Sequence, residues 1–479
     1  KMVQGLHKAG IRVIMDVVYN HVYDANKHVF NQVVPGYYFR YDAKGNLVSN
    51  SGCGNDTASE RAMMRKYIVD SVTYWAKNYN LDGFRFDLMG LIDKETMKEV
   101  RSALNQIDPS ILVLGEGWDM NTTMEKSRMS IQPNGYELAT DKSSVAFFND
   151  SYRDAIKGSV FDKTGKGFVQ GQFGQESLLA NNFMGCQNQK GFAACTNGNA
   201  NVHYASTNQL VQYVEVHDNL TLYDKLVASM PGVKQDELVK RDQLATAMVL
   251  LAQGVPEMQL GQTFLRTKGG DDNSYNKPDS ENAVDWDRLD QFKTSDDYAR
   301  GLIALRKALP AFRLGSYDQI NSHVTVIAQK DGLLAFKLAD ASGTYLVAFN
   351  GNGKAMNLTG LKKGTYTVVS SDGAVDSAAV KEIAAAVKNG SPNVRKAGSP
   401  KFQEVQVTDG TYSVPATSAL VLKEGELLAQ PAISQVEDPD TIQIKSQGHL
   451  TLPQTVKATW TDGRTTMEKV TWPALTAEQ

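Results

Sequence analysis

The chain has 479 residues, more than one ordinary domain holds, so we expect two to four structural units. Hydrophobic residues make up 42% of the chain and charged residues 22%, which is typical of globular proteins. The net charge is −3 and no block of five like charges occurs, which argues against nucleic-acid and anionic-membrane partners. No apolar run approaches the roughly 20 residues that span a bilayer.

Three cysteines are too few for a disulfide framework. Cys186 and Cys195 are near enough in sequence to close a small loop, but we expect free thiols because sequence alone does not fix pairing. No histidine or second CxxC accompanies them, so zinc is disfavoured. The first ten residues are typical of the end of a helix that stops at Gly10, so the chain is expected to begin inside a domain.

The first 310 residues alternate short apolar runs with helical patterns. Predicted strands lie at 11–21, 84–90, 111–119, 145–150, 211–219 and 255–262. Thr57 and Glu60 have capping-box spacing before the first long helix. Repeated βα units predict a parallel sheet in an α/β fold, and a series this long predicts a (β/α)8 TIM barrel. Six strands are present, so the first two would precede Lys1.

The pattern changes at about residue 311, where short alternating runs are separated by Gly, Asn and Asp turns. This pattern predicts an antiparallel β-sandwich domain over 311–428. Residues 429–479 have strand runs and a Thr461-Asp462-Gly463 turn, which predict the start of an Ig-like surface module. The predicted domains are therefore an incomplete barrel at 1–310, the sandwich, and this partial module.

Several predicted barrel strands end in polar or ionisable side chains. They are Asp16, Asn20 and His21 in the first run, Arg85 and Asp87 in the second, Glu116 in the third, and His217, Asp218 and Asn219 in the fifth. One such residue alone usually serves a turn or a helix cap. In a barrel, however, the carboxyl ends of all strands meet on one face, where the loops form the active site. The set therefore predicts a catalytic face.

The residue types indicate which chemistry this face performs. Arg85 and Asp87 are two positions apart in a strand, so they share one face, and the guanidinium favours the ionised carboxylate that a nucleophile needs. Glu116 lies between two glycines and before Trp118, where apolar walls would raise its pKa and suit a proton donor. Two carboxylates about 5–5.5 Å apart perform retaining glycoside hydrolysis. Asp218 would then hold sugar hydroxyls.

Simpler explanations exist for the same residues. Arg85 and Asp87 could form a structural ion pair, and Glu116 could be the neighbour of a helix cap. Neither explains why the loops are so aromatic, although aromatic side chains pack loops as well as stack on sugars. The aromatic loop residues are Tyr19, Tyr23, Tyr37, Tyr38, Trp118, Tyr223 and Tyr275.

The segments "DVVYNH", "GFRFDLMG", "LGEGWD" and "VEVHDN" resemble the four signature regions of the α-amylase clan of retaining α-glucan enzymes. Within the clan the chain most resembles type I pullulanases, the bacterial debranching enzymes. The segments "SGCGNDTASERAMMRKYIVDSV" and "FLRTKGGDDNSYNKPDSENAVDWDR" are also similar to that subgroup. The resemblance covers about residues 1–425. One departure is Thr263 in "GQTF", where the family usually has "GQEF", and a local loss is expected there.

The resemblance implies that Asp87 is the nucleophile, Glu116 the general acid/base and Asp218 the stabiliser of the transition state. Arg85 would position Asp87, with Asp16 and Asn20 as structural support. The implied substrate-binding residues are His21, His217, Tyr19, Trp118, Asn219 and Asp279. No metal ligand is predicted and no cofactor is required. Calcium occurs in many clan members, and the position of Asn20 can serve a metal elsewhere in the clan.

The implied reaction is hydrolysis of α-1,6 branch linkages in pullulan, amylopectin and related α-glucans. An α-1,4-acting amylase or neopullulanase-like enzyme would use the same carboxylates with a different groove. A non-catalytic glucan-binding surface protein is disfavoured, because a binding module gains nothing from an ionised nucleophile.

Two expectations concern the surroundings of the chain. It should be stable only beside the missing N-terminal part of the same protein, attached covalently or as a nicked companion chain. The polymer substrate and the Ig-like tail predict an extracellular bacterial protein, secreted or bound to the cell wall.

Overall fold

The computed structural model describes residues 1–140, 143–389, 402–425, 433–437, 452–460 and 464–472. Its first unit is a six-stranded parallel sheet in the order β1-β4-β5-β6-β9-β10. These strands are β1 (Ile14–Val17), β4 (Gly83–Phe86), β5 (Leu112–Gly115), β6 (Val145–Phe148), β9 (Leu210–Gln212) and β10 (Val255–Pro256). β1 and β10 are the two edges of the described sheet, so the predicted parallel sheet is confirmed as an open sheet.

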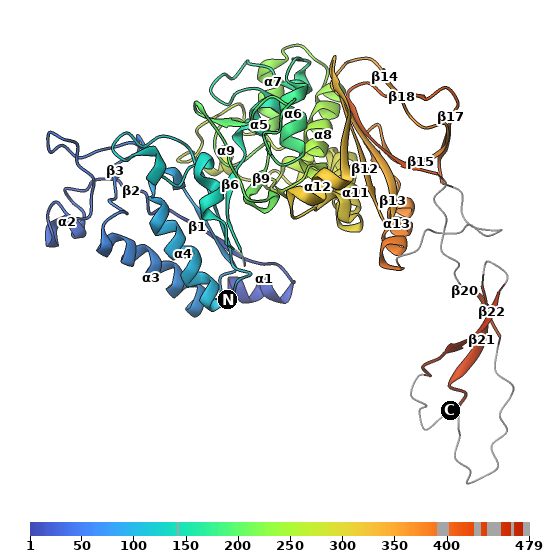
Figure 1. The fold of residues 1–479 in the computed structure, drawn as a ribbon, viewed down its shortest axis with the longest axis horizontal. Helices are drawn as coiled ribbons and strands as arrows, with labels where there is room; N and C mark the ends of the chain where they lie inside the picture. Colours follow the sequence, from blue (N-terminus) through green and yellow to red (C-terminus); the bar gives the residue numbers. More distant parts are fainter. Residues whose placement is uncertain (141–142, 390–401, 426–432, 438–451, 461–463, 473–479) are drawn as a thin grey trace, which may run out of the picture.

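Helices lie before, between and after these strands. In chain order they are α1 (Met2–Lys8), α2 (Val29–Val33), α3 (Ala62–Tyr79), α4 (Lys94–Ile107), α5 (Asp150–Lys157), α6 (Glu176–Phe183), α7 (Leu222–Ser229), α8 (Gln235–Leu251), α9 (Asp279–Asn282), α10 (Asp287–Gln291) and α11 (Lys293–Ala308). Two further helices, α12 (Tyr317–His323) and α13 (Ser377–Asn389), belong to the antiparallel region that follows. The helices α3 and α4 lie side by side next to β1 (Figure 1). Short hairpins pair β2 (His21–Val22) with β3 (Asn55–Asp56), and β7 (Thr196–Asn197) with β8 (Ala200–Asn201).

The predicted strands extend beyond the observed ones, and the difference is largest for the last two. The run at 211–219 forms a strand only as far as Gln212, and the run at 255–262 only at Val255–Pro256. His217 and its neighbours therefore lie in a loop beyond β9, where Asn219 has the left-handed φ of 64°. The β-branched and aromatic residues at 211–216 predict strand, but their burial comes from packing outside the ladder.

The predicted capping box before α3 is wrong. Arg61 occupies the N-cap position and makes no side-chain cap hydrogen bond. The Thr57 hydroxyl instead donates to the Tyr19 carbonyl at 2.6 Å, and Glu60 accepts from Arg40 at 2.9 Å. Capping-box spacing was therefore a coincidence of residues that make tertiary contacts. The predicted end of the first helix is confirmed, because α1 ends at Lys8 and Gly10 has a φ of 73°.

The predicted antiparallel region after residue 311 is confirmed as a seven-stranded sheet in the order β11-β12-β13-β19-β15-β16, with β17 also beside β15. Its strands are β11 (Val324–Lys330), β12 (Leu333–Asp340), β13 (Gly343–Asn350), β15 (Gly364–Ser371), β16 (Ala374–Val375), β17 (Glu404–Val407) and β19 (Ser418–Glu424). A smaller sheet pairs β14 (Met356–Thr359) with β18 (Thr411–Val414). A separate core lies between the two sheets and includes Leu346, Leu358 and Val414.

The other face of the seven-stranded sheet packs against helices, with α11 lying against the sheet in Figure 1. One continuous core holds Leu302 from α11, Met248 from α8 and Phe336 from β12. Phe183 stacks on Phe336, with ring centroids 3.7 Å apart. The core therefore runs across residue 310 without a break. The predicted boundaries at 310 and 428 stay predictions, and the second lies outside the described residues.

A third sheet contains β20 (Ile433–Val436), β21 (Thr455–Trp460) and β22 (Thr465–Lys469), all antiparallel. The predicted Thr461-Asp462-Gly463 turn lies outside the described residues, and the Ig-like assignment stays a prediction. The three cysteines are free thiols, as predicted, with Cys186 and Cys195 buried. None of the helices in the described ranges has both the length and the apolar character needed to cross a membrane.

Candidate active site

The carboxyl ends of β1, β4 and β5 bring the predicted catalytic side chains together. The parallel register places Asp16 of β1 directly beside Arg85 of β4. Asp87 and Glu116 follow β4 and β5 by one residue, and each backbone still extends the ladder. The Asp87 N–H donates to the Val17 carbonyl at 3.0 Å, and the Glu116 N–H to the Phe86 carbonyl at 3.1 Å. Backbone pairing therefore fixes where both carboxylates leave the sheet.

The Arg85 guanidinium joins three carboxylates. It donates to Asp16 Oδ1 at 2.9 Å, to Asp87 Oδ1 at 3.0 Å, and to Glu116 Oε1. The Arg85 side chain is buried, and its Cζ lies 5.8 Å from the Phe148 ring centroid. A buried cation that bonds to both Asp87 and Glu116 sets the separation of the two carboxylates.

Glu116 is only 3% exposed, and this burial controls its charge. Burial raises the pKa of Glu116 to about 7, although Arg85 and the Leu88 N–H lower it in part. That N–H donates to Glu116 Oε2 at 2.9 Å, and Leu88 adopts an unusual φ of 37° to present it. A carboxyl group that is partly protonated near neutral pH can donate a proton to a leaving group.

The two glycines that flank Glu116 allow the close packing around it. A Cβ at Gly115 would lie 2.7 Å from the Phe86 carbonyl oxygen, and one at Gly117 would lie 2.4 Å from Phe147 Cδ1. Real Cβ contacts do not come so close, so any side chain at either position would displace β4 or β6. The predicted close backbone approach at this motif is therefore present.

Asn20 bonds to the second oxygen of the Asp87 carboxylate and also contacts His21. The Asn20 amide donates to the Asp87 carbonyl at 2.6 Å and to Asp87 Oδ2 at 3.0 Å. Asn20 Oδ1 lies at hydrogen-bond distance from Nδ1 of His21, which fixes the imidazole ring. Since both ends of the buried Asn20 amide are occupied, this residue orients Asp87 and His21. No group of three or more His, Cys, Asp or Glu side chains placed to hold a metal ion occurs among the residues that the structure describes.

His217 and Asp218 lie on the exposed loop after β9, with His217 Nε2 3.7 Å from Asp218 Oδ1. The Asp218 charge is near enough to Glu116 to raise the pKa of that carboxyl group. The structure thus brings Asp16, Asn20, His21, Arg85, Asp87 and Glu116 into one bonded cluster and places Asp218 within electrostatic reach of it.

The loop that carries His217 and Asp218 is held by residues that the sequence analysis missed. Buried Glu215 accepts from the Leu222 N–H at 2.7 Å, at the start of α7. With its amide turned to donate, Gln259 bonds to Glu215 Oε1 at 2.7 Å and to the Val216 carbonyl at 2.9 Å. Lys268 Nζ donates to the His217 carbonyl at 3.0 Å. The signal for Glu215 was an acidic residue inside an apolar run.

The other residues that were predicted to bind substrate make fewer contacts with the catalytic cluster. The Tyr19 hydroxyl lies 2.8 Å from Ser71 Oγ, and its ring packs against Phe86, so it also serves the core. Trp118 is half-buried, and its Nε1 is buried without a hydrogen-bond partner in the described structure. Asp279 is exposed at the start of α9, and among the described residues its carboxylate makes no hydrogen bond or ion pair with the catalytic cluster. The sugar contacts of these residues, and of Asn219, stay predictions.

Thr263 stands where the family usually has glutamate, and the structure shows the contact that the threonine makes. Its hydroxyl donates to Asp296 Oδ1 at 2.7 Å, in the first turn of α11. A glutamate there would bring a second carboxylate against Asp296. The change is therefore local and lies outside the catalytic cluster.

Known proteins support the same assignment. No protein-family model matches the chain. The pullulanase of Bacillus subtilis (strain 168) is 41% identical over 340 residues, which is 71% of this chain and 46% of that protein. Pullulanase 1 of Arabidopsis thaliana, a chloroplastic protein, is 34% identical over 63% of this chain and 35% of its own length.

Solved structures agree with these relatives. The pullulanase of Bacillus acidopullulyticus matches with a TM-score of 0.76 and 36% identity, over 88% of this chain and 48% of that one. The type I pullulanase of Bacillus subtilis str. 168, complexed with maltose, matches with a TM-score of 0.77 and 34% identity, over 90% and 55%. The chain therefore spans about half the length of these relatives. Sequence and structure together show that the chain belongs to the pullulanases of the α-amylase clan and corresponds to their C-terminal portion.

Proposed function

We propose that the chain carries the catalytic carboxylates of a starch-debranching hydrolase that cleaves α-1,6 linkages in pullulan, amylopectin and related α-glucans. The observation that carries this proposal is the Arg85 guanidinium bonded to both Asp87 and Glu116 at the ends of adjacent parallel strands. Two carboxylates held close together are the catalytic pair of retaining glycosidases. Pullulanase structures complexed with maltose and maltotriose support a glucan substrate.

The reaction would proceed by double displacement. Asp87, bonded to Arg85 and aligned by Asn20, attacks the anomeric carbon while Glu116 gives its proton to the departing glycosidic oxygen. The sugar is then bound covalently to Asp87. Ionised Glu116 takes a proton from water, the hydroxide oxygen attacks the anomeric carbon, and the Asp87 carboxylate leaves. Asp218 and His217 would hold sugar hydroxyls, and no step uses a cofactor or a calcium ion.

Digestion of pullulan tests which bond is cleaved. The proposed α-1,6 activity releases maltotriose as the product. Panose or isopanose would instead assign an α-1,4-acting relative and overturn the bond specificity while keeping the carboxylate roles. If the protein with its complete barrel released no product, the proposed catalysis would be overturned. The chain would then be assigned to a glucan-binding protein.

We also propose that upstream strands of the same protein complete a (β/α)8 barrel. Both edge strands of the open sheet expose apolar side chains, with Ile14 of β1 41% exposed and Val255 of β10 43% exposed. Unpaired strand edges with apolar side chains tend to aggregate. The two missing strands could arrive covalently or in a nicked companion chain.

Size-exclusion chromatography with mass analysis tests this completion. The chain alone is expected to aggregate, and co-production with the upstream part of the protein should give a soluble complex. A folded 52.5 kDa monomer of the isolated chain would contradict the proposal.

The raised pKa of Glu116 predicts a pH dependence. Glu116 must be protonated to act as an acid, so kcat/KM should fall about tenfold per pH unit above about pH 7. Because the pKa of Glu116 in the folded chain lies above its usual 4.5, its ionisation also destabilises the fold as the pH rises from 4.5 towards 7. Glu116→Gln should remove both effects. A pH–rate profile that stays flat to pH 9 would contradict the assignment.

The anchor of the Asp218 loop gives a further prediction. Glu215→Gln weakens the bonds to Leu222 and Gln259, so kcat should fall by up to about 10²-fold as Asp218 moves away from the sugar. Thermal unfolding should show that the variant is folded. Glu125→Gln, at an exposed carboxylate without a cap bond, is the matched control and should leave kcat unchanged. Equal kcat for the wild type and Glu215→Gln would contradict the anchoring role.

For location, we propose an extracellular bacterial protein, secreted or bound to the cell wall. A polymeric substrate is too large to enter a cell. The β20–β22 sheet, which we read as part of an Ig-like surface module, supports the same location.

A further inference from the structure

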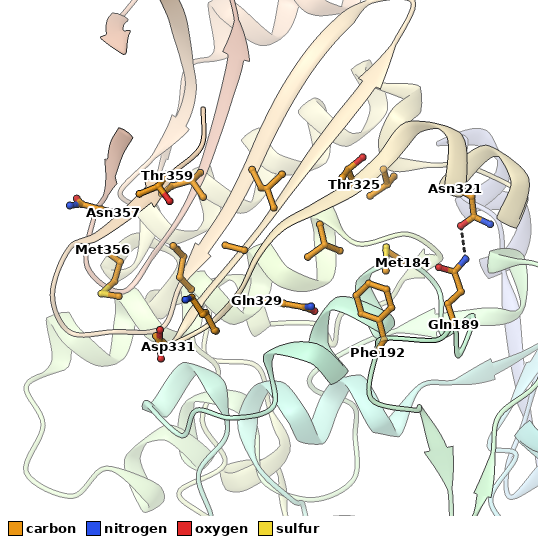
Figure 2. A pocket seen from close by; sticks show the side chains of 17 residues that line it. Met184, Gln189, Phe192, Asn321, Thr325, Gln329, Asp331, Met356, Asn357 and Thr359 are labelled. Atoms are coloured by element: carbon orange, nitrogen blue, oxygen red, sulfur yellow. Dashed lines mark hydrogen bonds between the residues drawn. The ribbon is translucent and has the colours of Figure 1, made fainter. Parts of the chain in front are cut away.

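A groove of about 970 Å³ lies beside β11, away from the catalytic cluster. One wall is the segment after α6, including Met184, Gln189 and Phe192, and the other is formed by β14 (Figure 2). In the described structure β11 is an edge strand that pairs only with β12, so its other edge forms no ladder with another described strand. None of the proposed catalytic residues lines this groove.

The lining of the groove is almost free of charge. Of the residues that line it, only Lys330 and Asp331 are charged, and they are adjacent at the turn that ends β11. The other lining residues are apolar or carry neutral amides and hydroxyls, such as Gln329, Asn357 and Thr359. Such a surface suits a neutral ligand with apolar faces and many hydroxyl groups, and does not suit an anionic or cationic one.

One side chain in the groove lacks a partner. The Oε1 atom of Gln329 is buried and accepts no hydrogen bond in the described structure. A buried acceptor left unsatisfied is unfavourable, so a ligand that donates an O–H or N–H to it would be stabilised. Gln329 and the half-buried Phe192 both line the groove (Figure 2), so an amide and an aromatic ring are available to a ligand there.

One wall of the groove, the segment after α6, is held in place by hydrogen bonds to α12. Gln189 Nε2 donates to Asn321 Oδ1 at 2.8 Å, which ties the segment after α6 to α12 (Figure 2). The Tyr317 hydroxyl donates to the Gly185 carbonyl at 2.9 Å and adds a second tie between the same elements. A preformed site loses little conformational entropy when it binds.

A polypeptide strand added to the edge of β11 is the other ligand to consider. The β11–β12 ladder shifts register between Val326 and Ala328, which marks a β-bulge in the pairing. Bulges twist an edge away from regular strand addition. The irregular edge and the uncharged hollow beside it therefore favour a ligand that bonds through scattered hydroxyl groups.

We propose that this groove binds a linear α-glucan chain at a second, non-catalytic site. The inference rests on the proposed function for the choice of glucan. The Phe192 ring would cover the apolar face of one sugar, and a sugar hydroxyl would donate to Gln329 Oε1. A chain held here and at the catalytic face would gain avidity, so the site would favour polymers over short oligosaccharides.

Two variants of the full chain test the site, Phe192→Ala and Gln329→Leu. Affinity electrophoresis in gels containing amylose should show that each raises the dissociation constant about tenfold. In the protein with its complete barrel, KM for amylopectin should rise while kcat on a short branched oligosaccharide stays unchanged. Phe161→Ala, at a 92% exposed ring outside the groove, is the matched control and should change nothing.

The outcomes separate this proposal from the proposed function. Unchanged amylose binding in both variants would overturn the second site, even with hydrolysis intact. A lower melting temperature with unchanged amylose binding would show that the groove packs a protein segment, which also overturns it. Amylose binding that depends on Phe192 in a protein without hydrolytic activity would support the site and overturn the proposed catalysis.

Discussion

Asp87→Asn is expected to lower kcat on pullulan by at least about 10⁴-fold, the scale on which loss of a catalytic group acts. The amide cannot attack the anomeric carbon as a carboxylate does, so no covalent intermediate forms. The variant should keep its fold, because asparagine has the shape of aspartate and its amide oxygen can still accept from Arg85, while the Asn20 amide keeps its hydrogen bond to the backbone carbonyl of residue 87. Initial rates of reducing-sugar release measure the effect.

The control for this substitution is Asp70→Asn, on the exposed surface of α3, where the carboxylate is 61% exposed and forms an ion pair with Lys66. Its rate should equal that of the wild type. Binding of maltotriose by Asp87→Asn should persist, because the substitution changes the reacting group and leaves the rest of the site in place. An Asp87→Asn protein that retained more than a hundredth of the wild-type kcat would rule out Asp87 as the nucleophile.

Glu116→Gln is expected to lower kcat on pullulan by about 10²–10⁴-fold, the usual contribution of positioned proton transfer. A glutamine cannot donate a proton to the leaving oxygen or take one from water. It still fits the pocket formed by Arg85 and the Leu88 N–H, since one of its atoms remains an acceptor. The reaction should therefore lose proton transfer without losing substrate binding.

Leaving-group dependence distinguishes this role from a structural one. An aryl α-glucoside with an acidic phenol needs no protonation to depart, so its bond-breaking step should be much less impaired in Glu116→Gln than that of pullulan. Added azide, which needs no general base, should restore turnover of the aryl substrate as a glycosyl azide. Equal losses on both substrates, without azide rescue, would assign Glu116 a structural role.

The local sequence was sufficient to predict which residues form the catalytic cluster. Arg85 and Asp87 share a face because residues two apart in a strand do so, and Asp16 joins them because parallel register aligns β1 with β4. The structure also explains the two glycines beside Glu116, which would clash with β4 and β6 if they carried side chains. These features could be predicted from strand geometry, because each depends on one strand and its immediate neighbours in the sheet.

Features that depend on distant packing were not predictable. The acidic Glu215 stands out in its apolar run, but its partners are Leu222 at the start of α7 and Gln259 in the loop after β10, and local sequence does not identify such distant partners. The helix α13 was missed because its alanine-rich sequence lies among strand-like runs. Thr57 and Glu60 met the capping rule and yet bind Tyr19 and Arg40, since tertiary hydrogen bonds outweigh a local preference.

The measurement that tests the central claim most directly is mass spectrometry of a trapped glycosyl-enzyme. A fluorinated α-glucosyl donor with a good leaving group forms the covalent intermediate quickly, and the fluorine slows its breakdown. After proteolysis, the label is expected on the peptide that contains Phe84 to Leu88, attached to Asp87. A label on another carboxylate, or full hydrolytic activity without any labelled peptide, would contradict the catalytic pair of Asp87 and Glu116.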